Sequence, residues 1–294
     1  MPSKAIIIIN PKAGAARAWP LCRRLETNLS RMGYKVCVQP TTHRGHAHQL
    51  AQKARSIADL VAAVGGDGTV AEVANGLAYA KIPLLIAPAG TENIIATELG
   101  LSNGPAKLET LLSRGQAHAV DLGCVNGRYF LAVLGAGFDA DVIHRVHKTR
   151  QGHISHLSYF WPIWRTFWEY RFPALQVEAD GELLYDGPAL AFVGNMARYA
   201  VGLRVLRDAQ FDDGLLDLCV FPCRWHGRLA LHSATTLLQI HPERRSVIYR
   251  RCRNIVISSN VQQVRVQVDG DPAGNLPARI EVCPGALSVL MMPA

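Results

Sequence analysis

Three glycine-containing turns follow three apolar segments in the first third of the sequence. They read Asn10-Pro11-Lys12-Ala13-Gly14, Gly65-Gly66-Asp67-Gly68-Thr69 and Pro88-Ala89-Gly90-Thr91-Glu92-Asn93. Glycine lets backbone N–H groups approach a phosphate closely, and the N-terminus of a following helix favours negative charge. The side chains of Asn10, Thr69 and Thr91 can add hydrogen bonds. Lys12 adds a cation, so the three turns together predict phosphate binding.

Asp67 lies between glycines in the second of these turns. A carboxylate beside a phosphate is repulsive unless a metal ion or a proton mediates between them. Asp67 therefore indicates either a Mg²⁺-nucleotide or a base near the group that accepts a phosphate. The chain has neither G-x-x-x-x-G-K-[ST] nor a G-x-G-x-x-G at a strand–helix turn, which excludes the two common nucleotide fingerprints.

The segments around the turns alternate between strand and helix patterns. Apolar runs at residues 5–9, 35–39, 60–64 and 82–87 indicate strands, and apolar residues at i, i+3, i+4 and i+7 from Val70 indicate a helix. Continuous apolar strands separated by helices are typical of a parallel sheet covered on both faces. We therefore predict a doubly wound α/β domain over residues 1–122, with the three turns gathered at the carboxyl edge of its sheet.

The second part of the chain has a different pattern of apolar and turn residues. Short segments that alternate or run apolar lie between Gly, Asn and Asp turns, and Asn126-Gly127 and Asp180-Gly181 are hairpin signals. We predict an antiparallel β-sandwich over residues 123–294, with a few helices inserted and with last residues that can return to the first domain. No low-complexity linker separates the two domains, so we expect them to pack closely.

The composition indicates a globular protein with an anionic partner. Of the 294 residues, 49% are hydrophobic and 18% are charged, which excludes a disordered chain. The net charge of +8 suits a nucleotide or an acidic membrane face. We expect no nucleic-acid partner, because like charges form no block longer than residues 250–253.

The cysteines and the apolar runs indicate where in the cell the protein is located. The seven cysteines include no Cys-x-x-Cys pair, so we expect reduced and mostly buried thiols in a cytoplasmic protein. Neither Cys219 and Cys223 nor the histidine groups have the ligand spacing of a zinc site. Four consecutive isoleucines near the N-terminus are too few for a signal segment, and no run approaches a membrane span. We expect at most a peripheral contact with the inner membrane face.

The segment GGDGTVAEVANGL closely resembles the signature of the diacylglycerol kinase catalytic-domain family, which includes bacterial lipid kinases, sphingosine kinases and ceramide kinases. The resemblance covers nearly the whole chain, because NPKAG, TTHRGHA, PAGTEN, VDLG, GAGFDADV, GNMARYAVG, FDDGLLDL and VDGDP follow in the family's order. It implies an α/β nucleotide domain followed by a β-sandwich, with the active site in the cleft between them. It also implies ATP and Mg²⁺ as cofactors and a lipid hydroxyl as the phosphate acceptor.

The resemblance implies roles for single residues as well. ATP contacts are carried over to Thr41, Gly65, Gly66, Asp67, Gly68, Thr69, Val70, Ala71 and Thr91, and we add Asn10, Lys12 and Glu92 as cofactor-binding candidates. The catalytic carboxylate is left open between Asp67, Asp121 and Asp271. A structural Mg²⁺ site is carried over to Asp213, completed by the backbone carbonyls of Gln210 and Leu215.

Three positions depart from the pattern of many bacterial members. Glu92 and Ile94 stand where those members have Gly and Asp, and Asp271 stands where they usually have Glu. Phosphoryl transfer depends mainly on positioning and charge stabilisation, so a shorter base need not abolish it. Two alternatives therefore stay open beside a lipid kinase: an NAD kinase-like phosphotransferase, and a nucleotide or lipid sensor without catalysis.

The segment HLSYFWPIWRTFWEY, residues 156–170, has two interpretations. One is a core helix packed on the sandwich. The other is an acyl-chain wall or membrane-contact helix with interfacial aromatic residues and arginines nearby. The resemblance leaves the lipid acceptor open, and an exposed edge of the sandwich permits a homodimer.

Overall fold

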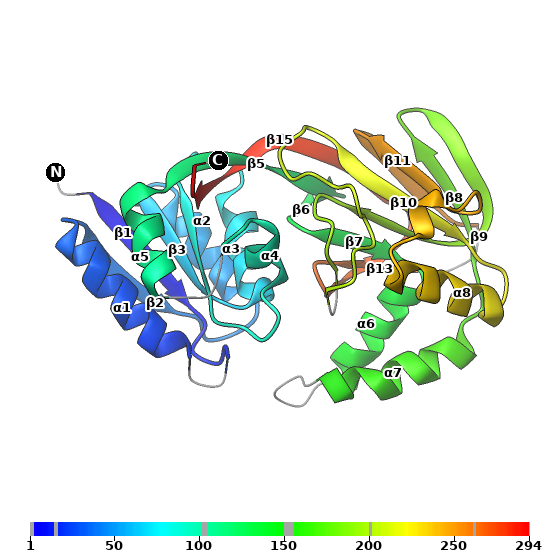
Figure 1. Cartoon of the computed structure of the whole chain (residues 1–294), viewed down its shortest axis with the longest axis horizontal. Helices are drawn as coiled ribbons and strands as arrows, with labels where there is room; N and C mark the ends of the chain where they lie inside the picture. Colours follow the sequence, from blue (N-terminus) through cyan, green and yellow to red (C-terminus); the bar gives the residue numbers. More distant parts are fainter. Residues whose placement is uncertain are drawn as a thin grey trace.

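A computed structural model describes residues 3–14, 17–101, 105–149, 156–199, 202–260 and 263–293. The chain forms two lobes, which are joined by the long strands β5 (Gln116–Val125) and β15 (Ala278–Met291) (Figure 1). Both strands contribute to each lobe, so the lobes share backbone hydrogen bonds. The predicted order of an α/β domain followed by a β-sandwich domain is confirmed.

The N-terminal lobe is built on four parallel strands in the order β2-β1-β3-β4. They are β1 (Lys4–Ile9), β2 (Lys35–Pro40), β3 (Leu60–Gly65) and β4 (Leu84–Pro88). The register places Ile9 beside Pro40 and Val64, and Val64 beside Ala87. The four strands therefore end at one edge, where the three glycine turns begin.

Helices cover this sheet, and β1 and β3 are almost entirely buried beneath them. The helices are α1 (Ala18–Arg31), α2 (His46–Ala54), α3 (Asp67–Leu77), α4 (Ile94–Glu98) and α5 (Pro105–Arg114). The apolar residues of α3 include Val70, Val73 and Leu77, which are all buried, as their spacing predicts.

The C-terminal lobe is mostly antiparallel and has its own apolar core. Its other strands are β6 (Arg128–Phe130), β7 (Val133–Ala136), β8 (Ala174–Ala179), β9 (Glu182–Gly194), β10 (Leu216–Pro222), β11 (Ile248–Cys252), β12 (Asn254–Ser258), β13 (Arg265–Val268) and β14 (Asp271–Asn275). Its helices are α6 (Phe138–Thr149), α7 (His156–Glu169), α8 (His226–Leu237) and the 3₁₀ turn η2 (His241–Glu243).

Both predicted hairpins are present in the C-terminal lobe. Asn126 and Gly127 connect β5 to β6 with φ of 48° and 84°, and Asp180 and Gly181 connect β8 to β9 with φ of 49° and 85°. Two consecutive positive φ angles are the signature of the tight hairpin turns that Asn-Gly and Asp-Gly favour.

The end of β15 pairs in parallel with β4 at Val289 and Leu84, after β15 has paired with β5 and β12. The last strand of the chain therefore lies against the sheet of the N-terminal lobe. No helix in the described ranges is long and apolar enough to cross a membrane.

Candidate active site

The three glycine turns meet at the carboxyl edge of the parallel sheet. Asn10 Nδ2 donates to Thr69 Oγ1 at 3.2 Å, which links the first turn to the second. The backbone N–H of Ala89 donates to the Gly65 carbonyl at 2.8 Å, which links the third turn to the second. A Cβ placed on Gly90 would lie 2.6 Å from the Cα of Gly66, so these two backbones approach as closely as glycine allows.

Gly14 and Asn93 hold the outer two turns in place. Gly14 has φ of +60°, and a Cβ there would lie 1.7 Å from the carbonyl oxygen of Ala89. Asn93 is buried with φ of 52°, and its side chain makes two hydrogen bonds with the backbone of Gly90, at 2.8 and 3.0 Å. The sequence analysis predicts no role for Asn93, although Asn beside a glycine turn is the residue type that tolerates this backbone conformation.

Asp67 belongs to the second turn, is the first residue of α3 and contacts the helix that follows the third turn. Its Oδ1 accepts the N–H of Ile95 at 2.9 Å, so the carboxylate also caps the start of α4. Burial raises the pKa of Asp67, and the nearby Glu92 carboxylate adds to the rise, while hydrogen bonds from the Ile94 and Ile95 backbones oppose it. The carboxylate therefore has a fixed position at the glycine turns, and its oxygens are ligands that suit Mg²⁺.

Other predicted nucleotide contacts lie along the same edge. Thr41 directly follows β2, and its N–H donates to the Ile9 carbonyl at 2.8 Å. Thr91 and Glu92 are exposed, as is Lys12, whose N–H donates to Asn10 Oδ1 at 3.0 Å.

Two further predicted contacts have different surroundings. Val70 is 2% exposed, so only its backbone could reach a ligand. Ala71 lines a hollow between the lobes.

This hollow is a cleft of about 450 Å³. The N-terminal lobe contributes Gly68, Ala71 and Glu72 to it, and the C-terminal lobe contributes Arg128, Asp269 and Asp271. A Cβ on Gly68 would have no atom within 4 Å, so Gly68 borders open space. A larger hollow of about 700 Å³ is lined only by residues of α1 on the outer surface, where no predicted site residue lies.

Asp271 faces the cleft and is surrounded by cationic and titratable groups. Its Oδ1 forms an ion pair with Arg44 of the N-terminal lobe and lies 3.7 Å from His147 Nε2, while its Oδ2 lies 3.8 Å from Arg128. Its side chain is 29% exposed, so solvent or a substrate can reach the carboxylate. Sequence spacing does not connect Arg44, Arg128 or His147 to Asp271. Arg44 comes from the opposite lobe, and the other two come from β6 and α6 of the same lobe.

Glu72 is a further residue of this region for which the sequence analysis predicts no role. Its two carboxylate oxygens accept the N–H groups of Gly45 at 2.9 Å and Ala47 at 3.1 Å. Glu72 therefore caps α2 and holds the loop that carries Thr41 and Arg44 against α3. The signal in the sequence is its position on α3, five residues after Asp67.

Asp121 occupies a buried backbone network rather than the cleft wall. It is 3% exposed, and its two carboxylate oxygens accept the N–H groups of Gly214 at 2.6 Å and Gly285 at 2.7 Å. Its backbone carbonyl accepts from Asn195 Nδ2 at 2.7 Å. This arrangement holds β5, β15 and the 210–215 loop together and does not support a contact between Asp121 and an acceptor hydroxyl.

An arginine side chain lies beside the carboxylate of the predicted structural Mg²⁺ site. Arg251 forms an ion pair with Asp213 Oδ2, and Asp213 Oδ1 accepts the N–H of Leu215 at 3.0 Å. The guanidinium neutralises the carboxylate that would have to bind the metal, and Leu215 presents its N–H to that carboxylate. In this arrangement Gln210, Asp213 and Leu215 do not fit a cation.

The aromatic helix α7 is only partly packed against the protein. Trp161, Trp164 and Trp168 are 66%, 49% and 58% exposed, whereas Phe167 packs against the core. The side chains of Tyr159 and Phe160 lie outside the described part. These exposures exclude an ordinary core helix for the described tryptophans and favour a contact surface.

Comparison with known families gives two matches along the chain. The family described as the diacylglycerol kinase catalytic domain matches residues 4–125. The family described as the YegS C-terminal NAD kinase beta sandwich-like domain matches residues 132–291. The two matches correspond to the two lobes.

Individual relatives match over almost their full lengths. A diacylglycerol kinase of Mycobacterium tuberculosis is 30% identical, with 98% of this chain and 94% of the relative covered. A diacylglycerol kinase of Bacillus subtilis is 26% identical, with 93% and 91% covered. A crystal structure of a candidate diacylglycerol kinase from Bacillus anthracis superimposes with a TM-score of 0.79 at 25% identity, covering 99% of this chain and 98% of that one.

Proposed function

Because this chain belongs to the diacylglycerol kinase catalytic-domain family, we propose that it transfers the γ-phosphate of ATP to the hydroxyl group of a lipid. The observation that carries the proposal is the meeting of three glycine turns beside an interlobe cleft. Gly66 and Gly90 bring two backbones into contact, and Gly68 opens onto the cleft that Asp271 borders from the other lobe. Donor and acceptor would meet between these two walls.

The glycine turns would hold the phosphates of ATP. α3 begins just after β3, and the helix dipole and the N–H groups at its N-terminus favour negative charge. Magnesium, when bound, would neutralise charge that develops on the phosphates, and the Asp67 carboxylate would hold it. Arg44 and Arg128 add positive charge to the cleft.

Asp271 is the described carboxylate best placed to orient the acceptor hydroxyl and take its proton. It borders the cleft opposite Gly68, whereas both oxygens of Asp121 accept backbone hydrogen bonds in a buried position. Arg44 pairs with Asp271 across the lobes and fixes the orientation of the carboxylate. Asp67 would act on the phosphate side of the same cleft.

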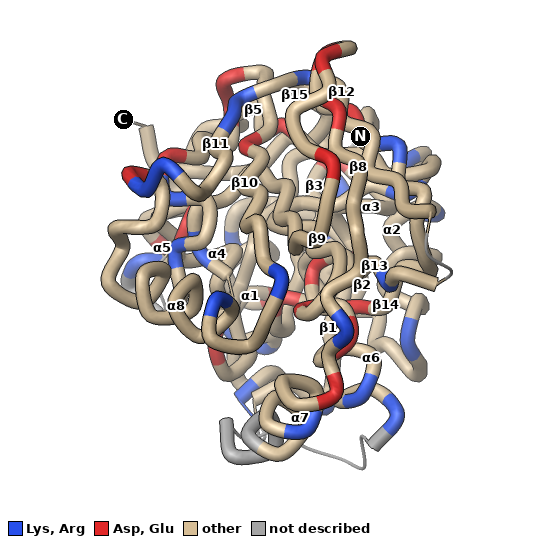
Figure 2. The backbone as a smooth tube through the Cα atoms, turned by 90° about the vertical axis from the view of Figure 1, so that its right-hand side faces the viewer, with Lys and Arg blue, Asp and Glu red and all other residues tan. Residues whose placement is uncertain are grey.

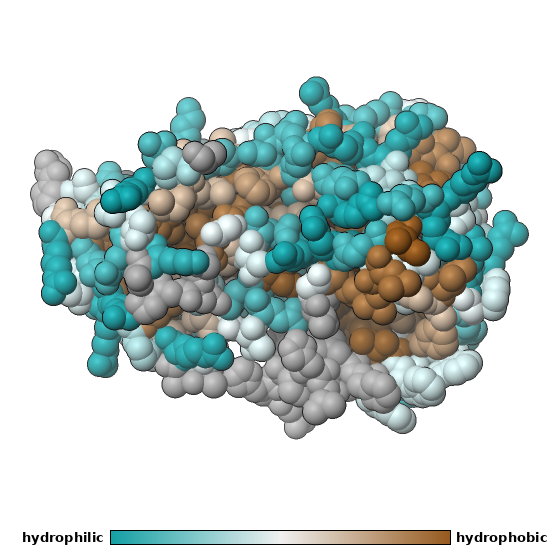
Figure 3. All heavy atoms as spheres, in the orientation of Figure 1, coloured by the Kyte–Doolittle hydropathy of each residue, from teal (hydrophilic) through white to brown (hydrophobic). Residues whose placement is uncertain are grey.

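A lipid acceptor would reach the protein at a membrane surface. Large apolar side chains are exposed on α7, on α8 and in the residues that flank α8: Trp161, Ile163, Trp164, Trp168, Trp225, Leu231, Leu237, Leu238 and Ile240. Figure 3 shows apolar residues gathered over α8, and Figure 2 shows basic positions on and beside α6, α7 and α8. Exposed aromatic residues beside basic ones suit the interface of an anionic bilayer.

The proposal is tested by transfer of labelled γ-phosphate from ATP into lipids. The full chain is incubated with Mg²⁺-ATP and detergent micelles that contain diacylglycerol, monoacylglycerol, a sphingoid base, phosphatidylglycerol or a polyprenol, and in parallel with NAD. Asp67→Asn is the test variant, because it keeps an oxygen acceptor for Ile95 N–H while it removes the charge. Asp213→Asn is the matched control, since it removes a carboxylate outside the glycine turns.

Label in one lipid class from the wild-type protein and Asp213→Asn, but not from Asp67→Asn, is the expected result. Label in NAD alone would replace the proposal with the NAD kinase alternative. Intact ATP binding with no label in any acceptor would favour the sensor and overturn the proposed reaction.

A further inference from the structure

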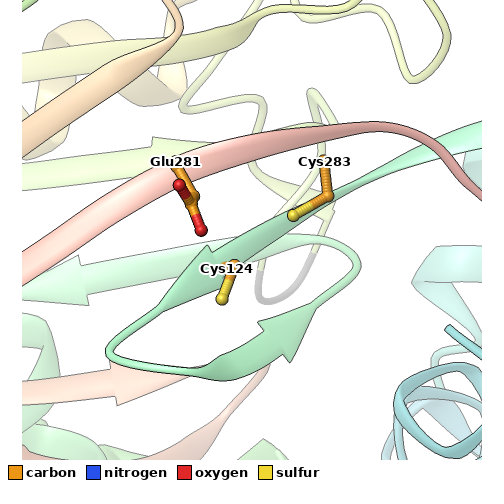
Figure 4. Close-up of side chains that lie close together, drawn as sticks. All are labelled: Cys124, Glu281 and Cys283. Carbon is orange, nitrogen blue, oxygen red and sulfur yellow. The ribbon is translucent and has the colours of Figure 1, made fainter. Parts of the chain in front are cut away.

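Two cysteines and a glutamate come together on the strands that join the lobes. Cys124 lies on β5 directly opposite Glu281 of β15, and Cys283 lies two residues further along β15. Directly paired residues share a face of an antiparallel sheet, and so do residues two apart on one strand. The ligand atoms of all three side chains lie within 4.8 Å of one another (Figure 4).

The cluster combines buried sulfur atoms with an accessible oxygen. Cys124 and Cys283 are 7% and 6% exposed, whereas Glu281 is exposed. The Tyr79 side chain lies beside the Cys283 thiol, and the two sulfur atoms lie within 4.8 Å of each other. A small cation could enter past Glu281 and reach both sulfur atoms.

The register of the strands favours a metal ion over a disulfide. Cys124 and Cys283 are diagonal neighbours, and such positions have Cα atoms about 7–8 Å apart. A disulfide usually requires a Cα separation of about 4.4–6.8 Å. A tetrahedral Zn²⁺ with Zn–S bonds of about 2.3 Å instead places two sulfur atoms about 3.8 Å apart, which lies within the spread of this cluster.

We propose that Cys124, Cys283 and Glu281 form a binding site for a divalent cation of the zinc class. Two thiolates and one carboxylate supply three ligands of the kinds that Zn²⁺ binds, and solvent beside Glu281 supplies the fourth. The site is separate from the glycine turns and does not depend on the proposed kinase reaction.

A cation bound at this site would stabilise the connection between the two lobes. β5 and β15 join the two lobes, and Cys124 pairs with Tyr129 of β6, which lines the interlobe cleft. The ring of Tyr129 contacts that of Tyr79 edge to face at 6.0 Å. A cation would therefore cross-link two strands directly behind one wall of the cleft and raise the thermal stability of the whole chain.

The test uses Co²⁺ as a spectroscopic probe and Zn²⁺ as a competitor on the reduced, chelator-treated full chain. Thiolate–Co²⁺ charge-transfer absorption and tetrahedral ligand-field bands report coordination, and thermal unfolding reports stability. The variants are Cys124→Ser, Cys283→Ser and Glu281→Gln. Cys37→Ser, on β2, is the matched control outside the cluster.

We expect one Co²⁺ per chain with thiolate absorption in the wild type and in Cys37→Ser, displaced by Zn²⁺ and accompanied by a rise in Tm. Either cluster serine should abolish the absorption, and Glu281→Gln should weaken binding by about tenfold or more. Absence of thiolate absorption in the wild type, or its persistence in both serine variants, would overturn the proposal. So would loss of two free thiols under mild oxidation with no Co²⁺ binding, which would identify a redox pair instead.

Discussion

The contact between Gly66 and Gly90 leads to a prediction about two single methyl groups. In Gly90→Ala, the new Cβ would lie 2.6 Å from Gly66 Cα and 2.9 Å from Asn93 Oδ1. Carbon atoms prefer separations of about 3.5–4.0 Å, so the two turns would have to separate by about 1 Å. Gly68→Ala is the matched control, because its methyl group meets no atom within 4 Å.

The two substitutions should change the stability of the protein in opposite directions. Overpacking of this kind costs about 1–3 kcal/mol, and distortion of the two Asn93–Gly90 hydrogen bonds adds about 1 kcal/mol. Gly90→Ala should therefore lower the Tm by roughly 4–8 °C in a chain of this length. Gly68→Ala lies in the first turn of α3 and should gain up to about 1 kcal/mol from helix propensity.

The assay combines calorimetric unfolding with ATP titration and lipid phosphorylation. Gly90→Ala should lose stability and ATP affinity together, because the turns that approach each other are the turns that we propose to bind phosphate. Gly68→Ala should gain stability but bind ATP more weakly, because its methyl group would project into the cleft. A Gly90→Ala protein with wild-type Tm and ATP affinity, or a Gly68→Ala protein less stable than Gly90→Ala, would refute this reasoning.

Three further predictions concern Asp139, the cleft and α7. Burial raises the pKa of Asp139 from 3.8 to about 6, so its favourable contribution to folding is complete below the unfolded pKa and is lost as pH rises to about 6. In urea unfolding, the free energy of unfolding should fall by up to roughly 3 kcal/mol between pH 4 and 8 because of this group, and Asp139→Asn should remove that fall. A variant whose free energy of unfolding depends on pH as that of the wild type does would contradict the prediction. Asp271→Asn should reduce lipid phosphorylation by about 10²–10⁴-fold with little change in Tm, since exposed ion pairs contribute about 1 kcal/mol or less; an unchanged kcat would exclude Asp271 as the base. Serine at Trp161, Trp164 and Trp168 together should weaken sedimentation with anionic vesicles by about tenfold or more, and equal sedimentation of variant and wild type would remove α7 from the membrane contact.

Local patterns were sufficient where neighbours in the sequence determine the structure. The burial of β1 and β3 follows from their continuous apolar residues, and the two hairpins follow from Asn126-Gly127 and Asp180-Gly181. The convergence of the glycine turns follows from parallel strands that end at one edge.

Contacts between distant segments could not be predicted in the same way. Arg44 and Asp271 are separated by more than two hundred positions, and nothing in either segment indicates their ion pair. The same holds for Asp213, a loop residue whose partner Arg251 comes from β11. Asp121 shows the limit most clearly, because a resemblance to an acceptor-side carboxylate does not reveal two backbone N–H groups that occupy its oxygens.

The sequence by itself determined the family, the order of the two folds and the position of the three glycine turns, because these depend on short motifs and on the periodicity of apolar residues. Tertiary structure alone decided which carboxylate faces the cleft, which cations surround it, which tryptophans of α7 reach solvent and which cysteines become neighbours. Each of these is set by the packing of one lobe or strand against another. Packing sums many weak contacts over the whole chain, so no single segment carries that information.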